Sequence, residues 1–414
     1  MRRADDEPPA GAPPVRSTFL PEAIRAVAAG VIETSLATFA VLIAVTQFQS
    51  GPALKSFLLA CPAVGLLGSL WAVPLVIRWH LTASKAAAVI SILSAIGFAI
   101  AALGSDSEMW FVIGMSIGIG VIGMAIPLQT HYLRLNYPGK SRGRLFSISL
   151  FIRASTSMIV SWGFGAYLDH DLDRYPVLLW TFVGAALLSA FCHFLVPSEK
   201  IRDPRSRDES QGHGLLESVE ISRNDQVFVR LLIAMMIMGF GVLSANALRV
   251  DYLVNPVHGL EWDVKTVSFI TGVVPSVMRL VSTFFWGWLF DHMNFFRLRI
   301  IVNVVFLAGI LLYFLGSTKS VILVGSALFG LGRGGGEIMF NLFVTKLAPA
   351  RHIADYMSVH TFLAGIRLSL APFLGFFVVV WADVPVMVVV SSSLVMLSIF
   401  AVRSAAKMAG SQKS

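Results

Sequence analysis

The sequence predicts an all-α polytopic membrane protein whose twelve transmembrane helices form two pseudo-symmetric six-helix bundles. Three observations lead to this fold class: charges are scarce, long apolar runs recur along the chain, and one polar stretch interrupts them near the middle. Only 14% of the 414 residues are charged, 56% are hydrophobic, and the mean hydropathy is +0.75. Soluble proteins are nearer one quarter charged, so no soluble fold could cover this much apolar surface.

The apolar runs have the length of helices that cross a bilayer, for which about 20 apolar residues are needed. The runs lie at 21–46, 54–77, 85–104, 109–132, 145–168, 177–196, 227–248, 264–290, 298–316, 320–345, 354–380 and 385–402. Each is long enough to cross the membrane, most of them with some tilt. The sequence therefore predicts twelve crossings joined mainly by short loops.

The domain organisation follows from the polar stretch between the sixth and seventh runs. The predicted parts are a disordered cytoplasmic tail at 1–20, an N-terminal bundle at 21–197, a cytoplasmic linker at 198–226, a C-terminal bundle at 227–403 and a cytoplasmic tail at 404–414. A weak internal repeat supports the division, because Lys55 and Lys265 open the second run of each half. Most Lys and Arg residues fall on one side of the membrane, which predicts cytoplasmic termini and a multi-pass protein of the cell inner membrane.

Composition also excludes several functions. The net charge of +8 is dispersed over loops and forms no nucleic-acid-binding patch. Cys61 and Cys192 lie inside apolar runs, so we expect buried, inert thiols rather than a disulfide framework. The sequence contains no phosphate-binding Walker loop, zinc-binding helix motif or hydrolase elbow. We therefore expect no enzymatic activity, no cofactor and no metal.

The connection between the eighth and ninth runs carries the most specific motif. It reads Gly287-Trp288-Leu289-Phe290-Asp291-His292-Met293-Asn294, followed by Arg297 and Arg299. Gly287, Leu289 and Asp291 match the Gly-x-Leu-x-Asp-Arg-x-Gly motif of the major facilitator superfamily, which the sequence resembles over essentially its whole length. His292 and Asn294 depart from that motif, and the motifs of proton-coupled drug exporters are not evident. The resemblance implies a secondary transporter that moves a small solute by alternating access.

Ionisable side chains inside the apolar runs are the candidate functional residues, because each costs about 2.5–3.5 kcal/mol at the bilayer centre. They are Glu33, Arg153, Arg279, Arg333, Glu337 and Arg367. Helical spacing adds Asn341 to the stripe of Arg333 and Glu337, and it adds His360 to the stripe of Arg367. We interpret these eight residues as a solute-binding and coupling set. The resemblance implies that the helices carrying the charges line or flank the transport cavity.

The same charges have a second interpretation as contacts between helices, with Glu337 pairing with Arg333 or Arg279. Four arginines against two glutamates leave a positive excess, which favours an organic anion as the solute. Glu33 is either the proton carrier of a coupled mechanism or a fixed partner for an arginine. The expected partners are therefore a small solute, protons and the lipid bilayer, and we expect the protein to be a monomer.

Two pairs of charges at the cytoplasmic helix ends are predicted to act as gates. By analogy with the family, Asp291 faces Arg144 and Arg78 faces Asp355, while Gly287 belongs to the same motif as Asp291. Topogenic charge with ordinary surface pairing is the alternative. The remaining function classes are a non-transporting sensor or scaffold on the same fold, a drug or cation exporter, and an integral-membrane enzyme.

Overall fold

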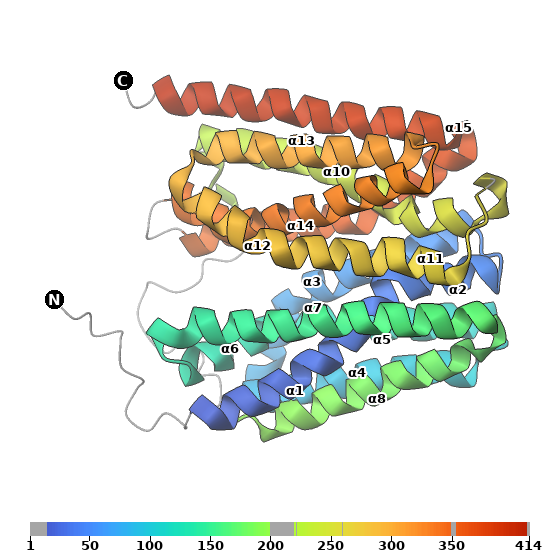
Figure 1. The fold of residues 1–414 in the computed structure, drawn as a ribbon. Helices are drawn as coiled ribbons and strands as arrows, with labels where there is room; N and C mark the ends of the chain where they lie inside the picture. The colour runs from blue at the N-terminus through green and yellow to red at the C-terminus, as the bar shows by residue number, and fades with distance from the viewer. Residues whose placement is uncertain (1–14, 199–218, 221, 259, 349–352, 412–414) are drawn as a thin grey trace. The chain divides into compact units, whose positions relative to one another are not determined.

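The computed structural model describes residues 15–198, 219–220, 222–258, 260–348 and 353–411, and its elements there are helices (Figure 1). In chain order they are α1 (Val15–Thr34), η2 (Ser35–Phe39), α2 (Ala40–Thr46), α3 (Pro52–Arg78), α4 (Ala83–Leu103), α5 (Glu108–Gly120), η3 (Val121–Ala125), α6 (Ile126–Asn136), α7 (Gly139–His170), η4 (Leu172–Arg174), α8 (Tyr175–Leu195), α10 (Gln226–Val254), η6 (Pro256–His258), α11 (Val264–Ser268), η7 (Phe269–Val273), α12 (Val274–His292), α13 (Phe295–Leu315), α14 (Lys319–Leu347) and α15 (Ile353–Ser411). The predicted all-helical class is confirmed.

Within the described part of the chain, ten helical stretches are long and apolar enough to cross a membrane. One of them, Tyr356–Gly410, has 55 residues, and it contains a non-helical residue, Asp383, with φ 74° and ψ 168°. Asp383 therefore divides it into two helices of spanning length. A shorter apolar helix, Pro52–Gly68, lies within α3. These helices are consistent with the twelve predicted crossings.

The chain forms two compact units, which we call unit 1 and unit 2. Unit 1 contains residues 1–50, 57–206 and 262–272, and unit 2 contains residues 51–56, 207–261 and 273–414. Two short segments thus belong to a different unit from the residues that follow them in the chain. The first is the start of α3, and the second is the α11–η7 segment that precedes α12. Most of the predicted linker at 198–226 lies outside the described residues, and the predicted domain boundaries stay a prediction.

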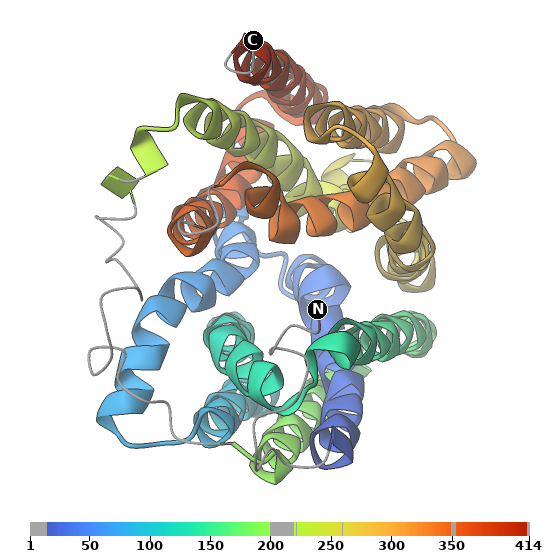
Figure 2. The ribbon, with the colours of Figure 1, turned by 90° about the vertical axis from the view of Figure 1, so that its left-hand side faces the viewer.

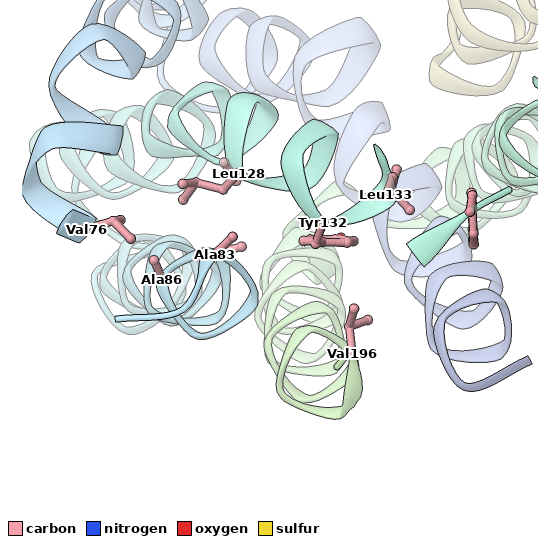
Figure 3. Close-up of a cluster of buried hydrophobic side chains, with 10 residues drawn as sticks. Val76, Ala83, Ala86, Leu128, Tyr132, Leu133 and Val196 are labelled. Atoms are coloured by element: carbon pink, nitrogen blue, oxygen red, sulfur yellow. The ribbon is translucent and has the colours of Figure 1, made fainter. Parts of the chain in front are cut away.

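Unit 1 is held together by close packing between small residues. Figure 3 shows one apolar cluster in which Leu128 of α6 faces Ala83 and Ala86 of α4, while Tyr132 of α6 lies over the helix that ends just before Val196. At Gly97 of α4, an added Cβ would come within 3.0 Å of the backbone of α5. Glycine is therefore what allows these two helices to approach so closely.

Local π-helical turns widen two helices of unit 1. One is η2, which follows α1, and the other is η7, which precedes α12. The hydroxyls of Thr38 in η2 and Thr271 in η7 lie 3.2 Å apart and form a buried hydrogen bond. Turns of this kind are frequent at functional sites because they interrupt the regular ladder of backbone hydrogen bonds. Here they bring two polar side chains together inside apolar helices.

Unit 2 is built around α10, which packs against α15, while α13 and α14 complete the bundle. Figure 2 shows the helices of the unit nearly end-on, running side by side. Aromatic rings fill the space between them at one end: Phe228 of α10 stacks on Phe343 of α14 at 6.1 Å and meets Tyr356 of α15 at 4.3 Å between ring centroids. These contacts hold together the helices that carry three of the candidate charges, Arg333, Glu337 and Arg367.

Candidate functional site

In unit 1, two of the predicted residues form one ion pair. Arg153 of α7 donates from Nε to Glu33 Oε2 of α1 at 2.7 Å. The two helices can meet there because Gly30 lies one turn before Glu33, where an added Cβ would overlap the backbone carbonyl of Arg153. The Arg153 side chain remains 45% exposed, whereas that of Glu33 is 9% exposed. The pair thus presents a guanidinium on the surface of a membrane-spanning helix.

In unit 2, three more predicted residues share one carboxylate. Glu337 Oε1 of α14 accepts from Arg279 Nη1 of α12 at 3.3 Å and from Arg333 Nε, one turn earlier on α14, also at 3.3 Å. Both contacts that the sequence offered as links between or along helices are therefore present. Close packing at Gly330 brings α12 and α14 together, because an added Cβ would meet the backbone of Pro275. Arg333 and Glu337 remain about half exposed, at 53% and 49%, while Arg279 is 12% exposed.

The exposure of these side chains within apolar helices has a chemical consequence. Hydrocarbon cannot solvate a charged group, so charges inside spanning segments face the bundle interior or a water-filled cavity. Arg153, Arg333 and Glu337 are too exposed to be buried in protein. We therefore expect the faces carrying them to meet water. Faces of this kind would offer guanidinium donors and carboxylate acceptors to a solute.

The other predicted site residues lie elsewhere. Arg367 of α15 donates from Nη1 to the carbonyl of Met235 on α10 at 2.8 Å. His360 is 1% exposed and lies between the rings of Phe340 and Phe343, at 4.5 and 4.6 Å between centroids. Neither residue makes a hydrogen bond or ion pair with the carboxylates described above. Asn341 belongs to α14, but its side chain lies outside the described residues.

The predicted gating residues occupy helix ends. Gly287 and Asp291 lie in the last turns of α12, and Asp291 is exposed. Arg144 lies near the start of α7 and Arg78 is the last residue of α3, and both are exposed. Asp355 lies in α15, with its side chain outside the described residues. The two proposed gate pairs stay a prediction.

A buried polar network in unit 1 escaped the sequence analysis. Glu22, which is 1% exposed, accepts from both Nε and Nη2 of Arg25, the former at 2.9 Å. The Tyr132 hydroxyl donates to Glu22 Oε2 at 3.1 Å and lies 3.3 Å from His193 Nδ1. The network ties α1 to α6 and α8. The signal was available in the sequence, because Glu22 and Arg25 are three residues apart inside an apolar run.

A second missed network lies in unit 2, where α10 ends. Lys55 and Asp251 are 4% and 2% exposed, and Lys55 Nζ lies 2.5 Å from Asp251 Oδ1. Asp251 also accepts from His258 Nε2 at 3.1 Å and from Asn255 Nδ2 at 3.3 Å. Lys55 Nζ lies 5.0 Å from the ring centroid of Phe376. These contacts tie the first turn of α3 to α10 and α15.

Comparison with known proteins places the fold and the family. The Major Facilitator Superfamily sequence profile matches residues 24–372. Among curated proteins, none matches the sequence. The solved structure of the nucleoside transporter NupG is 14% identical, with a TM-score of 0.75, and the match covers 94% of this chain and 99% of that one. A D-xylose-proton symporter is 17% identical, with a TM-score of 0.62 and coverage of 94% and 96%.

A third similar structure is the fucose:proton symporter FucP of E. coli, which is 14% identical with a TM-score of 0.58 and covers 94% of this chain and 99% of its own. At these identities the structures establish the fold, and the profile match over most of the chain establishes the family. Both agree with the helical spans and with the Gly287–Asp291 motif at the end of α12. The chain belongs to the major facilitator superfamily, and it is a multi-pass secondary transporter.

Proposed function

We propose that this transporter moves a small anionic solute across the cytoplasmic membrane by alternating access, acting as a single chain with both termini in the cytoplasm. In unit 2, the solute would meet the exposed charged faces of α12 and α14. The observation that carries the proposal is the cluster around Glu337, in which two guanidiniums share one carboxylate. The three side chains together carry one net positive charge. A carboxylate or phosphate would bind to such a cluster through a bidentate contact with an arginine.

The Glu33–Arg153 pair supplies a mechanism for coupling to protons. While Glu33 is ionised, it holds the Arg153 guanidinium at 2.7 Å. Protonation of the carboxyl would remove the charge that holds Arg153 and would free its guanidinium to bind an anion. Proton binding and solute binding would then favour one another, which is the requirement for symport. Two of the structurally similar proteins are described as proton symporters.

The proposal is tested by transport into proteoliposomes, with and without a pH gradient. A thermal-shift panel of organic anions, sugars, amino acids, nucleosides and cationic drugs first identifies a ligand of the purified protein. Arg279→Gln and Arg333→Gln should then reduce anion uptake at least tenfold, while Arg403→Gln, at an exposed position of α15, should not. Undiminished transport of a neutral solute by Arg153→Gln and Arg279→Gln would exclude the anion mechanism.

The coupling step has its own measurement. Glu33→Gln mimics the protonated carboxyl, so its solute uptake should lose its dependence on the pH gradient while binding persists. If uptake by Glu33→Gln still follows the gradient, Glu33 is not the proton carrier, and the alternative assignment as a fixed partner of Arg153 holds.

A neutral, hydroxyl-rich solute is the second candidate. It is favoured by the structural match to a nucleoside transporter, at a TM-score of 0.75, and by the matches to symporters of xylose and fucose. Arginine–carboxylate pairs provide both donors and acceptors for hydroxyl groups. The same ligand panel separates the two candidates, because nucleosides and sugars would then stabilise the protein while organic anions would not.

A further inference from the structure

Three basic side chains lie on α13 and α15 of unit 2, two of them almost fully buried and one partly buried. Arg299 of α13 is 3% exposed and His360 of α15 is 1% exposed. Arg367, two turns after His360 on α15, is partly buried. His360 and Arg367 are seven residues apart and therefore share one face of α15, and Arg367 and Arg299 both contact α10 between Met235 and Gly239. All three lie in helices long and apolar enough to span a membrane.

The guanidiniums of Arg367 and Arg299 contact neighbouring turns of α10. Arg367 Nη1 donates to the carbonyl of Met235 at 2.8 Å, and Arg299 Nη2 lies 3.1 Å from the sulfur of Met238. The next residue, Gly239, makes room for Arg367, because an added Cβ would come within 3.0 Å of Arg367 Cδ and Nε. The fold thus holds the two cations in fixed positions with weak, uncharged partners.

Two nitrogen atoms of this cluster have unused hydrogen-bonding capacity. Arg299 Nε and His360 Nε2 are buried and have no hydrogen-bond partner among the residues that the structure describes. Within the same residues, the contacts of the three side chains include no carboxylate. A buried charge without a counter-charge is costly, by several kcal/mol for an isolated ion. The missing component is therefore negative and accepts hydrogen bonds.

We propose that Arg299, Arg367 and His360 form a binding site for a small inorganic anion of the size and charge of chloride. Two guanidiniums supply charge and N–H donors, and the imidazole supplies one further N–H. The surrounding methionine and phenylalanine side chains favour a compact monoanion over a bulky one, because little space is left between packed helices. The site is buried, so it is distinct from the exposed pairs assigned to the solute and does not depend on that assignment.

The site is tested on the purified protein by thermal unfolding, with sodium chloride replacing sodium gluconate at constant ionic strength. Wild-type protein should gain melting temperature with chloride and reach a plateau, and it should retain about one radioactive chloride per chain. Arg299→Met should lose both responses. Arg297→Met is the matched control, because Arg297 is exposed and lies two residues away on the same helix. The control should respond to chloride as the wild type does.

In the same chloride titration, the order of stability of the wild type and Arg299→Met should reverse, which a purely structural role for Arg299 would not produce. In gluconate, Arg299→Met should be at least as stable as the wild type, because it removes a buried charge that has no counter-ion. In saturating chloride the order should reverse. Gly239→Ala is the second variant, and by displacing Arg367 it should raise the chloride midpoint at least tenfold. An absent response in the wild type, or an unchanged response in Arg299→Met or Gly239→Ala, overturns the proposal.

Discussion

The buried pair of Lys55 and Asp251 allows a quantitative prediction about stability. Asp251→Asn removes the negative charge that lies 2.5 Å from Lys55 Nζ, and the Lys55 side chain is only 6% exposed. The ammonium is then left buried and uncompensated. Removing one partner of a buried ion pair costs about 3–5 kcal/mol. We therefore expect Asp251→Asn to lower the free energy of unfolding by about that amount.

Substitution of Lys55 should lower the free energy of unfolding by less than substitution of Asp251 does, because Asp251 has other partners. After Lys55→Met, Asp251 still accepts from His258 Nε2 at 3.1 Å and from Asn255 Nδ2 at 3.3 Å. The loss is then one hydrogen bond to a charged group, worth about 1.5–3 kcal/mol. The double variant Lys55→Met/Asp251→Asn leaves neither charge buried. Its cost should fall short of the sum of the single costs by about 1–3 kcal/mol.

Unfolding in mixed micelles of increasing SDS fraction, followed by circular dichroism, measures these free energies. Lys407→Met is the control, because Lys407 is exposed, and it should change stability by no more than about 0.5 kcal/mol. Costs that add within about 0.5 kcal/mol in the double variant would show that the two charges do not interact, and the reasoning would be refuted. A smaller cost for Asp251→Asn than for Lys55→Met would refute the predicted asymmetry.

Three further predictions concern the packing of unit 1. Glu22→Gln should destabilise the protein by about 3 kcal/mol, because it leaves the partly buried Arg25 guanidinium without its carboxylate, and Tyr132→Phe should cost about 1 kcal/mol; SDS unfolding that ranks them in the opposite order would contradict this. Gly97→Ala should lower the melting temperature, while Gly184→Ala, whose Cβ would meet nothing within 4 Å, should not; equal melting temperatures would count against the close packing. The two buried cysteines should react with maleimide only after SDS is added, and rapid labelling of the folded protein would show that they are accessible.

The helical spans could be read from the sequence because the apolar runs are long and their interruptions are polar. Length and composition determine whether a segment lies in the membrane, and Asp383 sits between the last two predicted runs, where the structure divides the final long helix. The π-helical turns at η2 and η7 could not be predicted, since they depend on contacts between segments far apart in the chain, such as that between Thr38 and Thr271. The assignment of residues 51–56 to unit 2 and of residues 262–272 to unit 1 depends on tertiary packing in the same way.

The candidate site was predicted in part. The pairing of Glu337 with Arg333 came from spacing along one run, because side chains four residues apart lie on one face of a helix. The contact with Arg279, on another run, was predicted only as an alternative link between helices. Arg299 was assigned to the basic residues that follow the Asp291 motif, yet α13 already begins at Phe295 and buries Arg299. A sequence shows how deep a residue lies along a span. It does not show which way the side chain faces when apolar residues surround it on all sides.

Exposure within the spans therefore distinguishes two kinds of charged residue, which the sequence alone does not distinguish. Arg153 and Arg333 are about half exposed inside apolar helices, where hydrocarbon cannot solvate a charge, so we expect them to meet water. Glu22 and Asp251 are almost fully buried, and their partners within the protein satisfy them. Substitution of the exposed residues should therefore impair transport at little cost in stability, and substitution of the buried ones should do the reverse. Arg299 fits neither class, because it is buried without a carboxylate, and this is why its stability should depend on the anion in the buffer rather than on the transported solute.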